Sequence, residues 1–487
     1  MARLVILGAG VSGHTAALHA RRHLNPKDHE VVVISPNSKW NWIPSNIWVG
    51  VGVMKPEQVT FPLAPVYKRK GIRFIQAKAQ SIHPEGNAES DKPFVSYQIT
   101  GKDNNGTSGT IEYDYLINAT GPKLKFEATE GLGPANNSYS VCTYGHADQA
   151  NQAFEESVAR LKRGEKQTFL VGTGHGTCTC QGAAFEYLFN VEFELRKRGV
   201  RDKAEVVYVT NERELGDFGM GGMHLRKGGY ISHSRMFTES LFTERGIRWI
   251  DQAHVKQVNQ DSVAYERLDG SAGEQEFDFS MLLPPFSGVG LNAFDKQGKE
   301  ITETLFAPNQ FMRVDADYGK KSFEDWKPED WPSTYQSPLY DNIYAIGIAF
   351  APPHGLSKPL FSPDGTLISP AVPRTGMPSG VMAREVALNI VDMMKGKENQ
   401  PTRTASMAKM GAACIASAGA STLNGTAASI TMYPIVPDYE KYPESGGRDL
   451  NYTSGEIGLA GHWIKHLLHF GFIYKAKALP GWQFIPE

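Results

Sequence analysis

The stretch RLVILGAGVSG, residues 3–13, decides the fold of this chain. RLVIL predicts a short strand, GAGVSG predicts a tight turn, and the Ala-rich segment HTAALHARRHL (14–24) predicts a helix. A second strand, EVVVIS (30–35), follows. A strand, a glycine turn, a helix and a strand in this order predict the first unit of a dinucleotide-binding sheet.

The glycines of this turn have separate physical roles. We expect Gly8 to form the turn, Gly10 to let backbone N–H groups approach a pyrophosphate, and Gly13 to let helix and strand pack closely. Ser35 stands where an acidic residue usually binds the ribose, and its hydroxyl can still form a hydrogen bond.

The composition of the chain argues against some classes of function. The chain has 487 residues, enough for two or three domains, and its 41% hydrophobic and 21% charged residues are ordinary for a globular protein. A net charge of -2 gives no field that would attract nucleic acid. Apolar runs fall short of the roughly 20 residues of a spanning helix, so we expect only peripheral membrane contact. The N-terminus enters a strand at once, and we expect no cleavable signal.

Two later strands indicate which dinucleotide is bound. YDYLINATGPK (113–123) is a strand that runs into Thr120 and Gly121, and NIYAIGIAFAPP (342–353) is a strand that ends at Gly347. In flavoproteins with two dinucleotide-binding domains such strands close over one FAD site. We therefore expect FAD as the cofactor.

A second glycine turn, in QTFLVGTGHG (167–176), precedes a helix and a strand and predicts a duplicated domain. In many flavin reductases this domain binds NAD(P)H. Side chains such as His175 and Cys178 would crowd a pyrophosphate there, whereas Glu212 follows the next strand where a ribose-binding acid would stand. Both interpretations stay open, and the crowding favours another use of the turn.

The second glycine turn can serve sulfur chemistry instead of pyrophosphate binding, because Cys180 stands at the start of the helix that follows it. A thiolate at a helix N-terminus gains the macrodipole, which lowers its pKa, and it can then attack a disulfide or give electrons to a flavin. The alternative is that each cysteine is a small buried hydrophobe.

The last 27 residues, 461–487, mix aromatic residues with Lys and His. Trp463, Leu467, Phe470 and Tyr474 recur at helical spacing and form an apolar stripe. Such a helix either docks on the core or anchors the protein at a membrane surface, and we favour the anchor. Residues 354–380 predict a long irregular loop, a candidate lid.

The chain resembles the sulfide:quinone oxidoreductases over most of its length. The resemblance lies in six stretches: WNWIPSNIWVGVG (40–52), NATGPKLKFE (118–127), VCTYGHADQA (141–150), CQGAAFEY (180–187), VPRTGMPSGVMAREV (372–386) and ACIASAG (413–419). The chain departs from the family in its loop at 354–370 and in long stretches at 313–340 and 415–457.

The resemblance implies roles for the cysteines. Cys180 matches the cysteine beside the flavin, Cys414 matches its redox partner, and Cys142 matches a third cysteine linked to sulfur release or a flavin link in one bacterial branch. Cys178 has no counterpart. Sulfide would attack a disulfide or trisulfide that bridges Cys180 and Cys414, and the freed electrons would pass through FAD to a membrane quinone.

Proton handling is implied for Glu186 and His146, while Asp217 stands where the family has a histidine. The motifs and the resemblance together place FAD at eleven residues: Gly8, Gly10, Gly13, Ser35, Pro44, Asn46, Thr120, Gly121, Gly347, Thr375 and Gly376. Four aromatic residues are candidates for the quinone pocket: Phe470 or Phe472, and Trp482 or Phe484. The sequence shows no metal site.

We therefore expect an α/β protein with two Rossmann-like domains and a C-terminal amphipathic helical region that anchors it to a membrane. The expected domains are 1–130 and 301–397 for FAD, 131–300 for the second Rossmann-like domain, and 398–487 for the quinone and the membrane. We expect a peripheral protein of a prokaryotic inner membrane. The membrane side and the oligomeric state, a homo-oligomer included, stay open.

Three other functions remain in view. A type II NADH:quinone oxidoreductase shares this architecture, and a flavocytochrome c sulfide dehydrogenase flavoprotein shares the cysteine chemistry. A non-catalytic FAD-bound redox sensor is the third.

Overall fold

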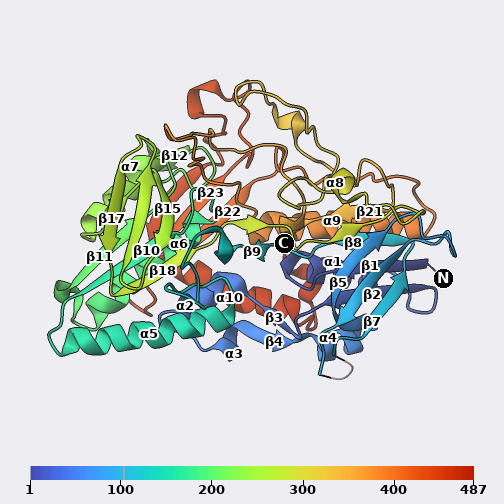
Figure 1. Ribbon diagram of the computed structural model, residues 1–487, viewed down its shortest axis with the longest axis horizontal. Helices are drawn as coiled ribbons and strands as arrows, with labels where there is room; N and C mark the ends of the chain where they lie inside the picture. The colour runs from blue at the N-terminus through green and yellow to red at the C-terminus, as the bar shows by residue number, and fades with distance from the viewer. Residues whose placement is uncertain (1, 103–104) are drawn as a thin grey trace.

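The computed structural model describes residues 2–102 and 105–487, and it contains one mixed and one parallel sheet toward opposite ends of the long axis (Figure 1). No helix in these two ranges is long and apolar enough to span a bilayer.

The first sheet has the strand order β21-β8-β1-β2-β5-β6-β7, and β20 pairs with β5. Strands β21, β8, β1, β2 and β5 are parallel, whereas β6 and β7 are antiparallel additions. The strands are β1 (Ala2–Leu7), β2 (His29–Ser35), β5 (Arg73–His83), β6 (Phe94–Ile99), β7 (Ser108–Glu112), β8 (Tyr115–Asn118), β20 (Asn292–Ala293) and β21 (Ile343–Ala345). The predicted return of residues 342–353 to the N-terminal sheet is confirmed.

Helices α1 (Val11–His23) and α9 (Gly376–Met394) pack against each other beside this sheet. Gly8 has φ +99°, and a Cβ there would lie 2.2 Å from the Ala119 carbonyl oxygen. A Cβ on Gly13 would lie 2.1 Å from the Gly8 carbonyl oxygen. The predicted roles of Gly8 in the turn and of Gly13 in close packing are therefore confirmed.

The second sheet, β14-β11-β10-β18, is wholly parallel. Its strands are β10 (Gln167–Thr173), β11 (Ala204–Val209), β14 (Arg248–Ile250) and β18 (Phe279–Leu283), and its helices are α5 (Tyr144–Lys162), α6 (Gln181–Lys197) and α7 (Ser234–Glu244). An antiparallel sheet follows in β15 (Ala253–Val258), β16 (Ser262–Arg267) and β17 (Ala272–Glu276).

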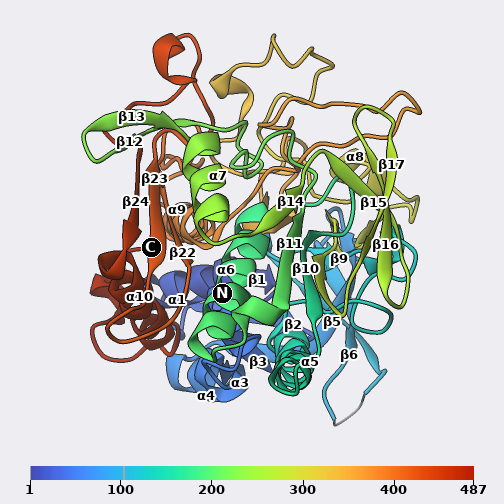
Figure 2. The ribbon, with the colours of Figure 1, turned by 90° about the vertical axis from the view of Figure 1, so that its left-hand side faces the viewer.

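A further sheet, in the C-terminal part of the chain, was not expected from the sequence, which predicted only a helical region there. Strands β22 (Ala412–Ser417), β23 (Ala427–Met432) and β24 (Ser454–Gly458) extend the hairpin β12 (His224–Lys227) and β13 (Tyr230–His233). Helix α10 (Leu459–Ala476) packs on β22 and β23 at one edge of the molecule (Figure 2). Many side chains of β22 and β23 are small, so this segment has no strong hydrophobic pattern. Small side chains also leave room for helices to approach.

Short elements complete the chain. They are β3 (Lys39–Asn41), β4 (Thr60–Pro62), β9 (Lys123–Leu124), β19 (Phe286–Ser287), α2 (Asn46–Val49), α3 (Pro56–Val59), α4 (Leu63–Lys70) and α8 (Thr302–Leu305).

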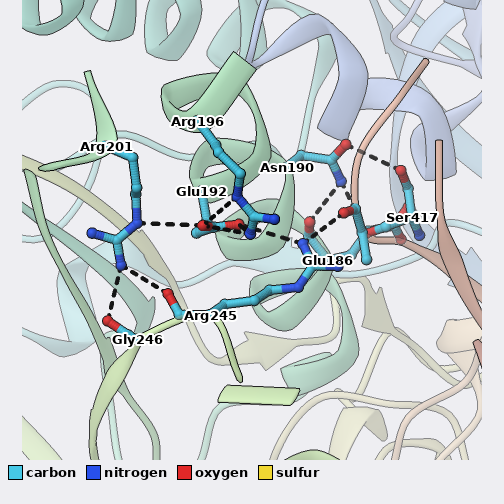
Figure 3. A network of polar contacts seen from close by, with 9 residues as sticks. Glu186, Asn190, Glu192, Arg196, Arg201, Arg245, Gly246 and Ser417 are labelled. Carbon is cyan, nitrogen blue, oxygen red and sulfur yellow. Dashed lines mark hydrogen bonds and ion pairs between the residues drawn. The ribbon is translucent and has the colours of Figure 1, made fainter. Parts of the chain in front are cut away.

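Hydrogen bonds to one serine fasten α6 to β22 (Figure 3). The Ser417 backbone N–H donates to Glu186 Oε1 at 3.0 Å, and the Asn190 amide donates to the Ser417 carbonyl at 3.0 Å. The Ser417 hydroxyl donates to Asn190 Oδ1, and the indole N–H of Trp48 donates to that hydroxyl. All these groups are buried, so each bond also avoids the cost of an unpaired polar group.

One turn further along α6, the buried Glu192 carboxylate holds three arginines (Figure 3). Its oxygens lie 2.7 Å from Arg196, 3.3 Å from Arg201 and 3.4 Å from Arg245. Arg245 also donates to the Ala418 carbonyl, directly after β22. Glu192 therefore secures a second contact between α6 and the C-terminal sheet.

Replacing Glu192→Gln should lower the free energy of unfolding by about 3 kcal/mol, because partly buried guanidinium groups lose their counter-charge. Urea denaturation measures this loss. The matched control is Glu205→Gln, whose bridge to Arg248 is about half exposed and should contribute less than about 1 kcal/mol. Equal losses in the two variants would contradict the role given to Glu192.

Candidate active site

Three glycines from distant segments leave an opening beside the first sheet. A Cβ on Gly10, Gly121 or Gly376 would meet no atom within 4 Å. The segments are neighbours, because a Cβ on Gly8 would touch Thr120 Cα at 2.9 Å. Backbone that lacks side chains around an open space fits the close approach of a dinucleotide.

Two helix N-termini meet at the same place. A Cβ on Gly347, which has φ +63°, would lie 2.1 Å from Ser12 Oγ and 3.6 Å from Ser379 Oγ. Ser12 belongs to the first turn of α1 and Ser379 to the first turn of α9. Both N-termini present unpaired N–H groups and the positive end of a dipole, which suits a diphosphate.

The remaining predicted cofactor residues divide into two groups. Ser35 is buried at the end of β2, and Thr375 is the N-cap residue of α9, directly before Gly376 of the opening. Thr120 donates its hydroxyl to Asn118, and Pro44 lies in a short 3-10 turn. Asn46 is fully buried, and its amide is used by Asn41 and the Val141 carbonyl. Asn46 thus holds the segment that leads to Cys142.

The second glycine turn is closed by other parts of the chain. The N–H of Gly176 donates to His254 Nδ1 at 2.8 Å, and the Gly176 carbonyl accepts from Ser369 at 2.9 Å. The Cys178 carbonyl accepts from Ala371 at 3.0 Å. A Cβ on Gly176 would lie 2.5 Å from the Leu367 carbonyl oxygen. The predicted lid loop therefore lies directly on the turn that would bind NAD(P)H.

Glu212, the acidic residue expected to bind a ribose, is also inaccessible to a ligand. Glu212 is fully buried and accepts hydrogen bonds from the Thr210 hydroxyl and the Phe218 N–H. Burial, together with the nearby charge of Asp217, raises the pKa of Glu212 to about 8. A buried, internally bonded carboxyl cannot bind a ribose, so the interpretation of Glu212 as a ribose ligand is wrong.

Cys180 has a backbone that only a few side chains tolerate. It is the N-cap residue of α6 with φ 67°, in the left-handed region. Non-glycine residues held there cost free energy and cluster at functional sites. Burial raises the pKa of the Cys180 thiol, while the Thr179 hydroxyl and the Arg374 guanidinium lower it. The expected net lowering by the helix terminus is wrong, because burial has the larger effect.

Cys414 lies on β22, which the Ser417 contacts hold against α6. Burial raises the pKa of Cys414 to about 11, with further contributions from the negative charges of Glu186 and Cys180. The charge of Cys180 also acts on Cys142, whose pKa burial raises to about 12. Cys142 and Cys414 therefore both lie within electrostatic reach of Cys180, and all three are free thiols.

Cys178 behaves as a packing residue. It is fully buried, and its thiol donates to the Leu283 carbonyl at 2.9 Å. Burial raises its pKa strongly. The structure supports the interpretation of Cys178 as a small buried hydrophobe rather than as a nucleophile.

The residues implied in proton handling lie in different places. Glu186 is buried on α6 and pairs with Lys465 of α10 at 2.7 Å. His146 is half-buried in the first turn of α5, 5.8 Å from the Phe126 ring, and burial lowers its pKa. Asp217 accepts the Ser357 hydroxyl in a separate cavity beside the lid loop, and burial raises its pKa.

Sequence reasoning missed two cations at this site. Arg374 donates to the carbonyls of Ile348 and Phe350 and acts electrostatically on Cys180. Its only sequence signal is its place in the PRTG stretch that precedes α9. The second cation, Lys465, lies in the C-terminal stretch that mixes aromatic residues with Lys and His, and it points inward to Glu186.

The four aromatic candidates separate into an inner and an outer pair. Phe472 stacks on Trp42 with centroids 4.9 Å apart, and Trp482 meets His19 edge-on at 5.1 Å. Phe472 and Trp482 line one cavity with Lys475. Phe470 and Phe484 are 62% and 82% exposed and lie on the surface.

Residues 2–102 and 105–487 contain no cluster of three His, Cys, Asp or Glu side chains arranged to hold a metal ion.

Comparisons with known proteins agree with this geometry. The family described as "Pyridine nucleotide-disulphide oxidoreductase" matches residues 2–316. The sulfide-quinone reductase of Aquifex aeolicus (strain VF5) is 32% identical over 97% of this chain and 91% of its own length. The mitochondrial sulfide:quinone oxidoreductase of Dictyostelium discoideum is 26% identical over 71% of this chain and 64% of its own length.

Solved structures give the same relation. The sulfide:quinone oxidoreductase of Aquifex aeolicus superposes with a TM-score of 0.75 at 28% identity, over 98% of this chain and 92% of that chain. NDH2 of Plasmodium falciparum in complex with NADH superposes with a TM-score of 0.62 at 13% identity, over 100% of this chain and 95% of that chain. The second likeness shows a common fold alone.

The closed glycine turn predicts that NADH does not bind. Titration of NADH into the holoprotein at millimolar concentration should leave its fluorescence that of free NADH. The backbone donors that would hold a pyrophosphate are covered by the loop around Ser369 or used by His254. Saturable binding at micromolar concentration would contradict the closure.

Proposed function

Because this chain belongs to the pyridine nucleotide-disulphide oxidoreductase family, and within it to the sulfide-quinone reductases, we propose that it oxidises sulfide and reduces a membrane quinone. The observation that carries this proposal is that Cys180 and Cys414, both partly buried, lie within electrostatic reach of each other. These cysteines come from α6 and β22, which the Ser417 contacts hold together.

FAD fits the glycine-lined opening. Gly10, Gly121 and Gly376 leave space for it, and the N-termini of α1 and α9 suit its diphosphate. Bound there, FAD supplies the acceptor for an electron pair that arrives from sulfur. The chain's part is to hold the thiols, to place protons and to exclude pyridine nucleotide from the second domain.

A sulfur bridge between Cys180 and Cys414 is the electrophile in this proposal. The sulfide ion HS⁻ attacks the bridge sulfur on Cys414, one S–S bond forms and one breaks, and Cys180 leaves as a thiolate. Arg374 supports this direction, since its positive charge lowers the pKa of Cys180 against the effect of burial. The Glu186 charge disfavours a thiolate at Cys414 instead.

Release of the sulfur product is assigned to Cys142. Its thiol lies within electrostatic reach of Cys180, and it follows the Asn46-bound segment at the start of α5. His146, in the first turn of α5, is the assigned partner for the proton that sulfide brings. Chain growth of the product then ends when the Cys142 thiolate attacks the bridge sulfur next to Cys414: an S–S bond to Cys142 forms, the S–S bond to Cys414 breaks, and Cys414 leaves as a thiolate.

The quinone ring is assigned to the cavity beside Phe472 and Trp42. Trp482 closes one side of this cavity, and Lys475, whose ammonium pairs with Glu487 and donates to the Ile485 carbonyl, also lines it. A planar quinone gains from stacking on such rings. A pocket built from α10 and the aromatic segment before α2 suits an acceptor that arrives from lipid.

Helix α10 is the assigned membrane contact. Its buried face carries His462, Lys465 and His469, whereas Leu467 and Phe470 face outward at 71% and 62% exposure. A helix in water usually buries its apolar side chains and exposes its charged ones, and α10 does the reverse. Large exposed apolar side chains are favoured where they contact lipid. The protein is then peripheral, on the inner membrane of a prokaryote.

Two observations weigh against the rival enzymes. The closed turn around Gly176 opposes a type II NADH:quinone oxidoreductase. The exposed apolar face of α10 favours a lipid-borne acceptor over the haem subunit of a flavocytochrome c sulfide dehydrogenase. Steady-state turnover with sulfide and quinone separates the enzyme from a redox sensor.

Anaerobic sulfide should bleach the flavin of the purified holoprotein, and NADH should not. Cys180→Ser and Cys414→Ser should each slow bleaching on the order of 100-fold or more, because each removes a partner of the sulfur bridge. Stopped-flow absorbance follows the reaction. Cys178→Ala is the control and should stay within about twofold, since that thiol only packs. Rapid bleaching by sulfide in Cys414→Ser would overturn the cysteine assignment.

Phe472→Ala and Phe470→Ala form a matched pair on α10. Phe472→Ala should slow reoxidation of the flavin by quinone about tenfold through lost stacking, and leave reduction by sulfide unchanged. Phe470→Ala should weaken binding to anionic vesicles about tenfold, because it removes an exposed apolar anchor. Stopped-flow reoxidation and vesicle sedimentation measure the two effects. If the two variants behaved alike in both assays, this would contradict the assignment of Phe472 to the quinone pocket and of Phe470 to the membrane anchor.

A further inference from the structure

The exposed apolar stripe of α10 ends in a cation. Four residues between 39% and 71% exposed make up the stripe: Trp463, Leu467, Phe470 and Tyr474. Lys477 follows Tyr474 by three residues and is the C-cap residue of α10 with helical backbone angles, so it continues the same face. Its ammonium lies over the Phe61 ring, 5.8 Å from the centroid. The apolar face of the helix therefore gives way to positive charge at this end.

Helix α4 lies beside this end of α10. The Arg69 guanidinium donates to the Lys477 carbonyl at 2.5 Å, across 408 residues of sequence. The Tyr67 hydroxyl bonds to His14, whose other ring nitrogen bonds to the Ala476 carbonyl. These contacts fix the last turn of α4 against the last turn of α10.

The last turn of α4 carries three cations: Lys68, Arg69 and Lys70. Lys68 and Arg69 are exposed, and Lys70 is partly buried. The bond from Arg69 to a carbonyl at the end of α10 accounts for that residue. No ion pair within residues 2–102 and 105–487 includes Lys68, Lys70 or Lys477, although other lysines of α10 are paired. Burial and the charge of Arg69 lower the pKa of Lys70. Like charges are thus held together here without a carboxylate.

We propose that Lys68, Lys70 and Lys477 bind the phosphate of an anionic phospholipid, whose acyl chains lie along the apolar stripe of α10. Cations held together repel one another, and a bound phosphate relieves this repulsion. The inference deepens the proposed function, because it names the lipid that the membrane contact selects. It rests on the contact of α10 with a membrane.

The position of these cations favours a lipid over a free phosphate ion. Lys68 is exposed at the surface, where a small ion keeps its hydration. A phospholipid presents its phosphate at the depth where an interfacial helix changes from apolar to charged side chains. The stem of Lys477 can lie along the Phe61 ring while its ammonium reaches the phosphate layer.

Sedimentation of the holoprotein with vesicles at low ionic strength tests the site. Vesicles of phosphatidylglycerol and phosphatidylcholine in equal parts are compared with vesicles of phosphatidylcholine alone. Each lysine near an anionic surface strengthens binding about fivefold, so Lys68→Gln/Lys70→Gln should weaken binding to the anionic vesicles roughly 20-fold. Binding to phosphatidylcholine alone should not change, and Lys68→Arg/Lys70→Arg should bind as the wild-type protein does.

The matched control, Lys299→Gln/Lys320→Gln, removes the same charge elsewhere. Both lysines are exposed and stand before and after α8 in the chain, and α8 lies away from α10 in both views (Figures 1 and 2). Its binding to anionic vesicles should stay within about twofold of the wild type, since salt screens distant charges. Equal losses in the two double variants would mean that only net charge matters, which overturns the proposal.

Further arms separate this inference from the proposed function. Equal binding of the wild-type protein to both kinds of vesicle would overturn the lipid selection and leave the membrane contact standing, whereas binding to neither would overturn both. Displacement from anionic vesicles by inorganic phosphate at constant ionic strength would identify a site for the free ion instead. Turnover of sulfide with a water-soluble quinone, measured without lipid, decides the proposed function separately, and Lys68→Gln/Lys70→Gln should leave it unchanged.

Discussion

The buried contact between α6 and Ser417 is the constraint on which the site depends. Glu186 and Asn190 reach across 231 and 227 residues of sequence to the same serine, and they fix β22 against the helix that Cys180 begins. Each bond joins groups without access to water, so its loss leaves an unpaired polar atom in the core. The positions of Cys180 and Cys414 follow from this contact in the structure, in which both are free thiols.

Local patterns in the sequence predict the parts of the fold that local physics decides. The glycines at positions 8 and 13 have the close contacts expected of them, and the strand ending at Gly347 returns to the first sheet. Strands β22 to β24 could not be predicted in this way, because their small side chains give no hydrophobic alternation. The closure of the second glycine turn was equally hidden, since it depends on a loop about 190 residues further along the chain.

The thiols show why a local rule can fail at a buried site. A helix N-terminus favours a thiolate, and this rule predicted a lowered pKa for Cys180. Burial reverses the sign, and only Thr179 and Arg374 oppose it. Lys465 shows a related limit: spacing on a helix tells which residues share a face, but it does not tell which face meets the core.

The central claim is that Cys180 and Cys414 form a sulfur bridge with each other. Mass spectrometry of a proteolytic digest, made under acidic conditions from enzyme that has turned over with sulfide, tests this most directly. The account predicts a cross-linked pair of peptides that carry Cys180 and Cys414, joined by two or three sulfur atoms. Cys180 bridged instead to Cys178, with Cys414 recovered as a free thiol, would contradict it.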